Sequence, residues 1–230
     1  MSWLITPQEK TPVDKLGIQN VSLLLHGEGT TIVDSSPSPK TLTAVGGAAP
    51  SSTQKKFGDK SIELDGDALV RVASNSQLQL GADNFTLESW VYLTGRGIGF
   101  GAYFDFRTAN VSQVNVLLSH LGTTSGGTSA TLKLFVNGNV VILGGDIPLT
   151  TWTHIALCRA SGNTRLFIDG TQSGSTYSDS NNYVSDLVRV GGNVVENAFI
   201  DGFLDEVRIT KGVARYTSNF TPPTAPFPDI

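Results

Sequence analysis

The sequence predicts an all-β protein, a two-sheet antiparallel jelly-roll sandwich with extended N- and C-terminal arms. Helical periodicity is nearly absent along the 230 residues. Short apolar or alternating runs instead recur between clusters of Gly, Asn, Asp and Ser, which is the pattern of a sandwich or a barrel. A chain of this length buries roughly 70–75% of its unfolded surface. We therefore expect a domain that folds without disulfides or metal, and Cys158 is its only cysteine.

The strand pattern recurs from residue 21 to residue 210. The expected strands are residues 21–26, 61–64, 69–73, 85–93, 102–107, 114–119, 131–136, 140–143, 153–159, 164–168, 187–190 and 199–210. Asn137-Gly138 predicts a hairpin, because a type I′ turn needs positive φ at both central residues. Ser161-Gly162-Asn163 predicts a second hairpin. Most of the chain is therefore expected in short antiparallel strands.

Both ends of the chain differ from the middle. Residues 1–19 contain two prolines and no clear period, and we interpret them as an N-terminal arm. Residues 20–210 form the predicted sandwich. Residues 211–230 contain four prolines and cannot form a ladder, so they are expected to be a proline-rich C-terminal extension.

Five segments carry a family resemblance. They are residues 57–66 (FGDKSIELDG), 85–91 (FTLESWV), 152–157 (WTHIAL), 166–170 (LFIDG) and 200–209 (IDGFLDEVRI). In their order and spacing they resemble the laminin-G-like jelly-roll family of the concanavalin A-like lectin and glucanase superfamily. Residues 211–217 (KGVARYT) look like the version found in phage particle and tail proteins. The resemblance implies two antiparallel sheets, one with a concave face, and hardly constrains the ligand.

The run 85–93 alternates as a half-buried strand does. Phe85, Leu87, Val91 and Leu93 fall on one face, and Thr86, Glu88, Trp90 and Tyr92 fall on the other. The first face is expected between the sheets. The second suits the concave surface implied by the resemblance. Trp90 and Tyr92 are therefore candidate stacking residues for a carbohydrate, with Glu88 beside them.

Glu63, Asp65 and Asp67 alternate in a way that resembles the acidic strand of retaining glucanases in this superfamily. That chemistry needs two carboxyl groups about 5–5.5 Å apart. Asp65-Gly66 favours a turn that ends the strand before Asp67. We therefore expect no catalytic site and no enzyme activity.

No cofactor is required by the sequence, and calcium is the candidate structural ion. In jelly rolls of the resembled superfamily a calcium ion ties the early strand to the late one, which here implies Asp34 and Asp205. Hard cations take six to eight oxygen ligands, which carboxylates and loop carbonyls supply. The alternative is that Asp34 caps a turn. The three histidines and Cys158 are not closely spaced, so zinc is not expected.

Composition excludes several classes of partner. The net charge of −4 argues against a nucleic-acid-binding surface. No run approaches the roughly 20 apolar residues of a membrane span. Residues 1–7 lack a basic leader, so no signal peptide is expected and the protein would be made in a host cytoplasm. Gly-x-Ser-x-Gly, P-loop and Rossmann motifs are missing from the sequence.

Trp3, Leu4 and Ile5 form an apolar triplet ahead of Pro7. One interpretation is that they fold back over a sheet edge. The other is that they hook into a neighbouring subunit. Full burial would yield on the order of 5–8 kcal/mol, against an association cost of about 4–15 kcal/mol, so a hook would need further contacts.

Three functions remain open at this point. The leading hypothesis is a non-catalytic structural or binding protein of a phage particle, either a capsid decoration or a tail-associated protein. It would reside in the virion, with its sandwich outward and its arms on other virion proteins or on copies of itself. The second is a carbohydrate-binding module for host or environmental glycans. The third, a glycoside hydrolase, is disfavoured by the arrangement of the acids.

Overall fold

The computed structural model describes residues 20–94, 100–108, 114–121, 128–195 and 197–229. This part of the chain is all-β, as predicted, with one three-residue 3-10 helix, η1 (Ser76–Leu78). The strands are β1 (Val21–Leu25), β2 (Leu42–Val45), β3 (Ala49–Ser51), β4 (Ser61–Asp65), β5 (Leu69–Val72), β6 (Phe85–Leu93), β7 (Phe100–Asp105), β8 (Val116–Leu121), β9 (Ser129–Val136), β10 (Asn139–Pro148), β11 (Thr153–Ala160), β12 (Asn163–Ile168), β13 (Thr171–Gln172), β14 (Tyr177–Ser178), β15 (Val188–Val190) and β16 (Asp201–Lys211). None of the described helices is long and apolar enough to cross a membrane.

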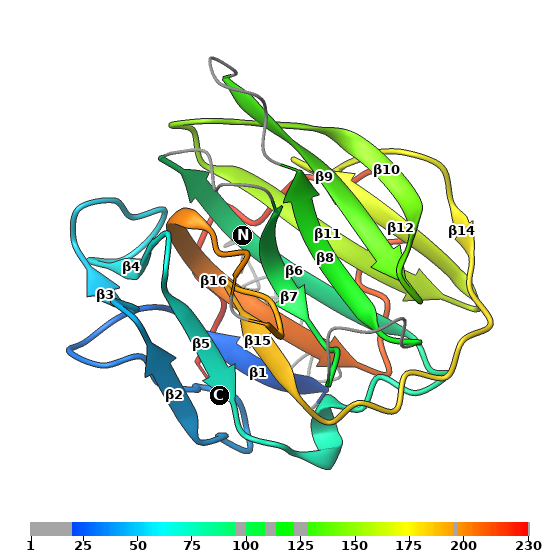
Figure 1. Cartoon of the computed structure of the whole chain (residues 1–230), viewed down its shortest axis with the longest axis horizontal. Coiled ribbons are helices and arrows are strands. Elements are labelled where there is room, and N and C mark those ends of the chain that lie inside the picture. The colour runs from blue at the N-terminus through cyan, green and yellow to red at the C-terminus, as the bar shows by residue number, and fades with distance from the viewer. Residues whose placement is uncertain (1–19, 95–99, 109–113, 122–127, 196, 230) are drawn as a thin grey trace, which may run out of the picture.

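The strands form two antiparallel sheets that stack face to face (Figure 1). Sheet A has nine strands in the order β13-β12-β11-β6-β16-β4-β3, with β1 also paired to β16 and β14 to β12. Sheet B has seven strands in the order β10-β9-β8-β7-β15-β5-β2. The sandwich prediction is confirmed.

The core lies between the two inner faces and follows from strand alternation. In β6 the side chains of Phe85, Leu87, Val91 and Leu93 belong to this core, as the sequence predicts. Leu132 and Leu134 of β9 face them from sheet B. Burying a side chain of this kind contributes about 1.5–3 kcal/mol, so alternation along each strand fixes which face of each sheet points inward.

Strand β16 lies within sheet A and pairs with the first described strand, β1, as well as with β4 and β6. Along one side it pairs with β6; along the other it pairs first with β4 and then with β1. The register with β6 shifts between Asp205 and Arg208, and Glu206 within this bulge has a φ of +53°. A bulge re-aims the side chains next to it, and here it turns Glu206 toward the end of the chain.

Four strands were not predicted from the sequence: β2, β3, β13 and β14. Strands β2 and β3 flank Gly46-Gly47, and β3 contains Pro50, which cannot donate to a ladder. Proline is tolerated there because β3 is an edge strand. β13 and β14 have two residues each and show no alternation.

The C-terminal tail, residues 213–229, extends without a ladder, but it lies on the outer face of sheet A and packs there. Tyr216 and Phe220 stack on each other, with ring centroids 3.5 Å apart, and pack on Phe167 of β12. The Phe220 N–H donates to the carbonyl of Gly170 at 2.9 Å. Gly170 has a φ of +74°, and a Cβ there would lie 1.9 Å from the Phe220 oxygen, so only glycine permits this approach.

The predicted N-terminal arm, residues 1–19, lies outside the described residues.

Candidate functional site

Two of the three residues predicted for carbohydrate stacking are buried, and one of them, Glu88, lies beneath the C-terminal tail. Glu88 has no exposed surface and Trp90 is 6% exposed. Lys56 covers Trp90, with its Nζ 3.7 Å from the ring centroid. Tyr92 is half-buried and packs against the half-buried Trp152 at 5.5 Å. Of the three predicted residues, Tyr92 alone keeps substantial exposed surface.

Glu88 is the centre of a buried ionic network. Its Oε1 accepts hydrogen bonds from Arg208, with Nη2 at 2.8 Å and Nε at 2.9 Å, and its Oε2 accepts one from the Tyr216 hydroxyl at 2.9 Å. His154 lies 3.4 Å from Oε2. Burial alone would raise the pKa of Glu88, but the charges of Arg208, His154 and Arg215 outweigh it and lower the pKa to about 2. Glu88 therefore holds the tail to the sheet as a carboxylate.

The two acids predicted to bind calcium are occupied by N–H donors. Both oxygens of Asp34 accept backbone hydrogen bonds, from Leu24 and Ser36 at Oδ1 and from Lys40 at Oδ2. Asp205 accepts from two backbone N–H groups with its Oδ2. Donors so placed compete with a cation for both oxygens of Asp34 and for Oδ2 of Asp205, and the described residues hold no group of three His, Cys, Asp or Glu side chains that could bind a metal ion. Asp34 organises a turn, the alternative that the sequence left open, and a calcium site that includes Asp205 stays a prediction.

Burial raises the pKa of Asp205 to about 7, although hydrogen bonds from Phe57 and Lys56 oppose the rise. Because this folded-state pKa exceeds the unfolded value near 3.9, the contribution of Asp205 to the free energy of unfolding decreases as the pH rises from about 4 to 7. Asp205→Asn keeps an acceptor oxygen and removes the titration. We expect the free energy of unfolding of the variant to rise by about 4 kcal/mol relative to that of the native protein between pH 4 and pH 8, as measured by urea unfolding. Asp67→Asn, in an exposed turn, is the control; parallel profiles for Asp205→Asn and the native chain would refute this prediction.

The three alternating acids do not share one strand. β4 ends at Asp65, and Gly66 has a φ of +88°, so Asp67 lies beyond the strand. Ile62 and Leu64 are buried in the core, as expected. The turn predicted at Asp65-Gly66 is present, and a row of three carboxylates is not formed.

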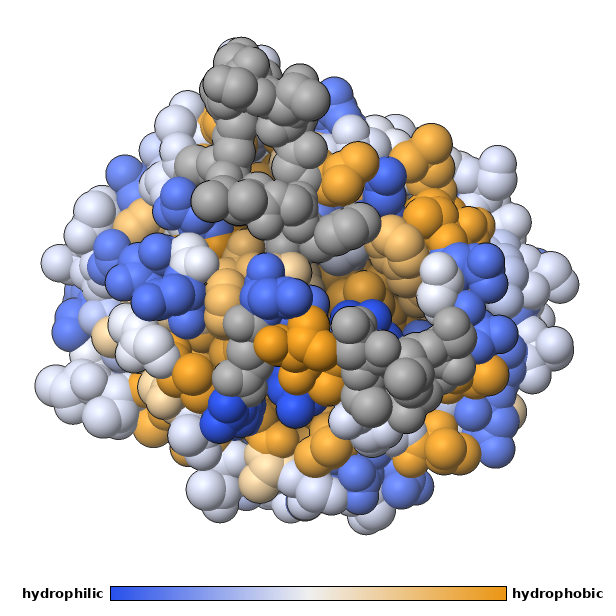
Figure 2. Space-filling model, viewed as in Figure 1, coloured by the Kyte–Doolittle hydropathy of each residue, from blue (hydrophilic) through white to orange (hydrophobic). Residues whose placement is uncertain are grey.

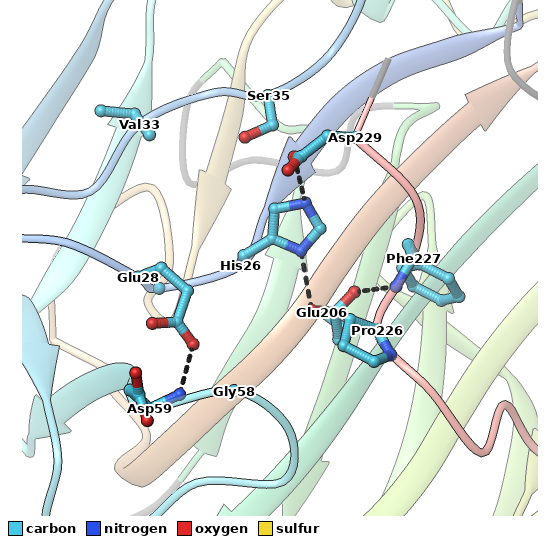
Figure 3. Close-up of a pocket in the computed structure, with 11 residues that line it drawn as sticks. His26, Glu28, Val33, Ser35, Gly58, Asp59, Glu206, Pro226, Phe227 and Asp229 are labelled. Atoms are coloured by element: carbon cyan, nitrogen blue, oxygen red, sulfur yellow. Dashed lines mark hydrogen bonds and ion pairs between the residues drawn. The ribbon is translucent and has the colours of Figure 1, made fainter.

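A pocket of about 390 Å³ lies where the C-terminal tail crosses the end of β1 (Figure 3). His26 stands at its centre between two carboxylates. Its Nδ1 lies 2.7 Å from Glu206 Oε1, and its Nε2 lies 3.1 Å from Asp229 Oδ1. Glu206 Oε2 accepts the N–H of Phe227 at 2.6 Å, and Arg208 lies 3.4 Å over the Phe227 ring. The pocket therefore contains the anchor of the tail.

Ser35 also lines this pocket, which raises the question of a serine nucleophile. A base activates such a hydroxyl through a hydrogen bond from it. Both ring nitrogens of His26 already contact carboxylates (Figure 3). Burial lowers the pKa of His26, but Glu206 and Asp229 outweigh that and raise it. His26 is arranged to hold the tail and not to activate Ser35.

The outer face of sheet B carries a different arrangement. One register row crosses it from strand to strand, with Asp105 and Leu117 buried within the row: Thr43, Arg71, Arg189, Asp105, Leu117 and Phe135. Beside this row lies a groove of about 240 Å³, lined by Arg71, Leu187 and Arg189 among others. Figure 2 shows hydrophobic and strongly hydrophilic residues side by side on one face of the molecule. Charged and apolar groups in one row suit an amphipathic ligand.

The sequence analysis missed Arg71 and Arg189. Each alternates with valines inside a strand that it identified, Leu-Val-Arg-Val and Val-Arg-Val. The alternation predicts outward arginines, but not that β5 and β15 are neighbours. The pairing of Arg71 with Arg189 could therefore not be predicted from the sequence.

Solved structures with this fold include domain 4 of AbnA, a GH43 extracellular arabinanase from Geobacillus stearothermophilus, in complex with arabinotriose. It is 19% identical with a TM-score of 0.57, and the match covers 85% of this chain and 94% of that one. The binding domain of Paraclostridial Mosquitocidal Protein 1 is 17% identical, TM-score 0.61, covering 84% and 49%. The binding domain of botulinum neurotoxin serotype C1 is 11% identical, TM-score 0.58, covering 84% and 49%. The chain thus spans about half the length of these toxin binding domains.

A search of the curated proteins finds no match to the sequence. The family model described as the concanavalin A-like lectin/glucanases superfamily matches residues 64–215. That range contains most of both sheets, including the β6 and β16 pair at the centre of sheet A. The chain therefore belongs to the Laminin_G_3 family of the concanavalin A-like lectin/glucanases superfamily.

Proposed function

We propose that the protein is a non-catalytic binding domain that takes up glycans on the outer face of sheet B. One observation carries this proposal. The outer face of sheet A is covered around Glu88 and Phe167 by the chain's own C-terminal tail, whereas the outer face of sheet B bears a groove with outward side chains from neighbouring strands. Ligand sites combine apolar walls with a few convergent polar groups, as this groove does.

The similar structures support a binding role. One was solved with arabinotriose, and others are named as the binding domains of toxins. The proposal places the ligand away from Trp90 and Glu88, because both are buried. Tyr92 and Trp152 remain a second stacking surface at the end of sheet A.

The test is a glycan array with the domain displayed as a tetramer, because multivalency raises apparent affinity by 10²–10⁴ and reveals weak single sites. Binding to a defined set of glycans would support the proposal. Arg71→Gln should lower the signal, while Tyr92→Ala should leave it unchanged. Loss with Tyr92→Ala alone would move the site to sheet A, and a blank array would refute glycan binding.

The domain is also proposed to have no glycosidase activity. Supporting this, Glu63, Asp65 and Asp67 do not lie together on β4, and both ring nitrogens of His26 lie against carboxylates. Incubation with β-glucan and arabinan should release no reducing ends. Hydrolysis that disappears in Glu63→Gln but persists in Asp67→Asn would contradict this assignment.

We propose further that the protein serves on a phage particle, as a capsid decoration or a tail-associated protein. The support is the phage-like segment 211–217 and the apolar triplet Trp3-Leu4-Ile5. Deleting residues 1–10 should leave the melting temperature nearly unchanged and prevent co-purification with assembled particles. A truncated chain that assembles normally would assign attachment to another surface. A truncated chain that unfolds would make the N-terminal arm part of the fold.

A further inference from the structure

The outer face of sheet A carries an aromatic surface at the end where β6 finishes and β16 begins. Tyr92 of β6 and Trp152, the residue before β11, are both half-buried there. Their ring centroids lie 5.5 Å apart, with the rings tilted by 54°. The buried ring of Phe203, the register partner of Tyr92 on β16, packs against Tyr92 at 6.1 Å. We call these three residues the aromatic platform.

Carboxylates border the aromatic platform on the same face of the sheet. Strands β4, β16 and β6 are neighbours in sheet A (Figure 1). Glu63 of β4 is the register partner of Phe203, and Asp65 is the partner of Asp201. Residues two apart on a strand point to the same face, so these acids lie on the side of the platform. Asp65 and Asp201 start about 4.5–5.5 Å apart, and like charges placed directly opposite destabilise a sheet.

The described part of the chain does not neutralise these acids. Its ion pairs involve other carboxylates, and none of them includes Glu63, Asp65 or Asp201. The one side-chain hydrogen bond to Asp201 comes, among the described residues, from the neutral hydroxyl of Thr94, 2.7 Å from Oδ1. Negative charge is therefore left unpaired beside the aromatic rings.

Aromatic faces and carboxylates both attract cations. A cation within about 6 Å of a ring centroid is drawn to the negative face of the ring. The protein already makes this contact on the outer face of sheet A, where Lys56 Nζ lies 3.7 Å from the Trp90 centroid. Arg208 makes it a second time, 3.4 Å from the centroid of Phe227. The aromatic platform offers the same contact to a cation from outside the chain.

The spacing of rings and acids fits one long cationic side chain. Asp201 is diagonal to Tyr92 across β16 and β6, a separation of about 7–8 Å that long side chains span. An arginine uses both features, because its planar guanidinium stacks on an aromatic ring and its N–H fork pairs with a carboxylate through two hydrogen bonds. From β11 to β4 the surface extends over three strand spacings, about 14 Å, which leaves room for the residues that flank such an arginine in a polypeptide.

We propose that the aromatic platform and its acids dock an arginine side chain of a partner protein. The guanidinium stacks on Tyr92 and Trp152, and its N–H groups pair with Asp201 and Asp65. The surface belongs to the opposite sheet from the groove assigned to glycans, so this inference goes beyond the proposed function and does not depend on it.

Isothermal titration with a matched pair of peptides tests the need for the cation. The probe is a short glycine peptide with two arginines, and its neutral counterpart carries citrulline, which has the same length without the charge. The arginine peptide should bind at least tenfold more tightly than the citrulline peptide. Its affinity should fall with added salt, because exposed charges are screened.

Four variants locate the site. Tyr92→Leu removes the ring and keeps an apolar side chain, and Asp201→Asn removes the charge and keeps an acceptor for Thr94. Each should weaken binding at least fivefold and keep the melting temperature, whereas Tyr92→Phe should bind as the native protein does. Asp83→Asn, at an exposed acid just before the other end of β6, makes the same change in net charge as Asp201→Asn and should leave binding intact.

Equal binding of the arginine and citrulline peptides would overturn the inference. Full binding in both Tyr92→Leu and Asp201→Asn would do the same. A chitosan oligosaccharide that binds more tightly than the arginine peptide, and loses affinity in Asp201→Asn, would overturn the assignment of a protein partner, because the occupant would then be an amino sugar.

Discussion

Truncation of the chain after Val213 is expected to lower the free energy of unfolding by about 4–6 kcal/mol, because the tail carries three aromatic anchors worth roughly 1.5–3 kcal/mol each when fully buried. Phe227 is buried with Val21 and Leu24, and Tyr216 and Phe220 cover a patch of sheet A. For a domain of this size the melting temperature should fall by roughly 10–20 °C. Differential scanning calorimetry of the two chains measures the difference.

A milder pair of variants separates the anchors from the length of the chain. Phe227→Ala removes a buried ring and should cost about 3 kcal/mol. Thr224→Ala, in an exposed stretch of the same tail, should change stability by less than about 0.5 kcal/mol. A truncated chain with the melting temperature of the full chain would mean that the tail contributes nothing to the stability of the sandwich.

Glu88→Gln is expected to cost about 3–5 kcal/mol, because removing one member of a buried ion pair leaves its partners uncompensated. Arg208, Arg215 and His154 all lie around this carboxylate. The pKa of Glu88 is lowered to about 2, so its stabilising contribution is complete above the unfolded value near 4.3 and is lost as the pH falls toward 2. The stability gap between native protein and variant should therefore narrow across this interval.

Urea unfolding at pH 7, 4 and 2.5 measures that gap. Glu63→Gln is the matched control, because Glu63 is a half-buried glutamate of the same sheet, and its change should stay within about 0.5 kcal/mol. A gap that is independent of pH would show that Glu88 acts through packing alone. A Glu88→Gln chain as stable as the native one at pH 7 would refute the network.

The sandwich was predictable because the signals that specify it, strand alternation and turn residues, lie close together in the sequence. Alternation in β6 and β9 specifies inner and outer faces, and Asn137-Gly138 specifies the β9–β10 hairpin, where both residues have positive φ. The tail was not predictable in this way. Its prolines rule out a ladder, which is correct, but its attachment depends on aromatic side chains meeting a distant sheet.

The candidate site shows the same division. Trp90 and Glu88 were placed on the correct face of β6, yet their burial depends on Lys56 and Tyr216, which are distant in sequence. Arg71 and Arg189 are outward by alternation but become a pair only through the neighbouring positions of β5 and β15. The local sequence pattern predicts which face of the sheet a side chain points to. Which side chains lie beside it depends on the order of the strands.

The pairing of β1 with β16 has a consequence for protein synthesis. β1 is a run of five buried residues, Val-Ser-Leu-Leu-Leu, and it hydrogen-bonds to β16. At about 5–20 residues per second, a ribosome needs roughly 10–40 s to reach β16 after making β1. During that interval the nascent chain carries an apolar strand whose partner does not yet exist. An unpaired strand of this kind is prone to aggregate, so a holdase chaperone that binds the nascent chain should raise the yield of folded protein more than one that acts after release.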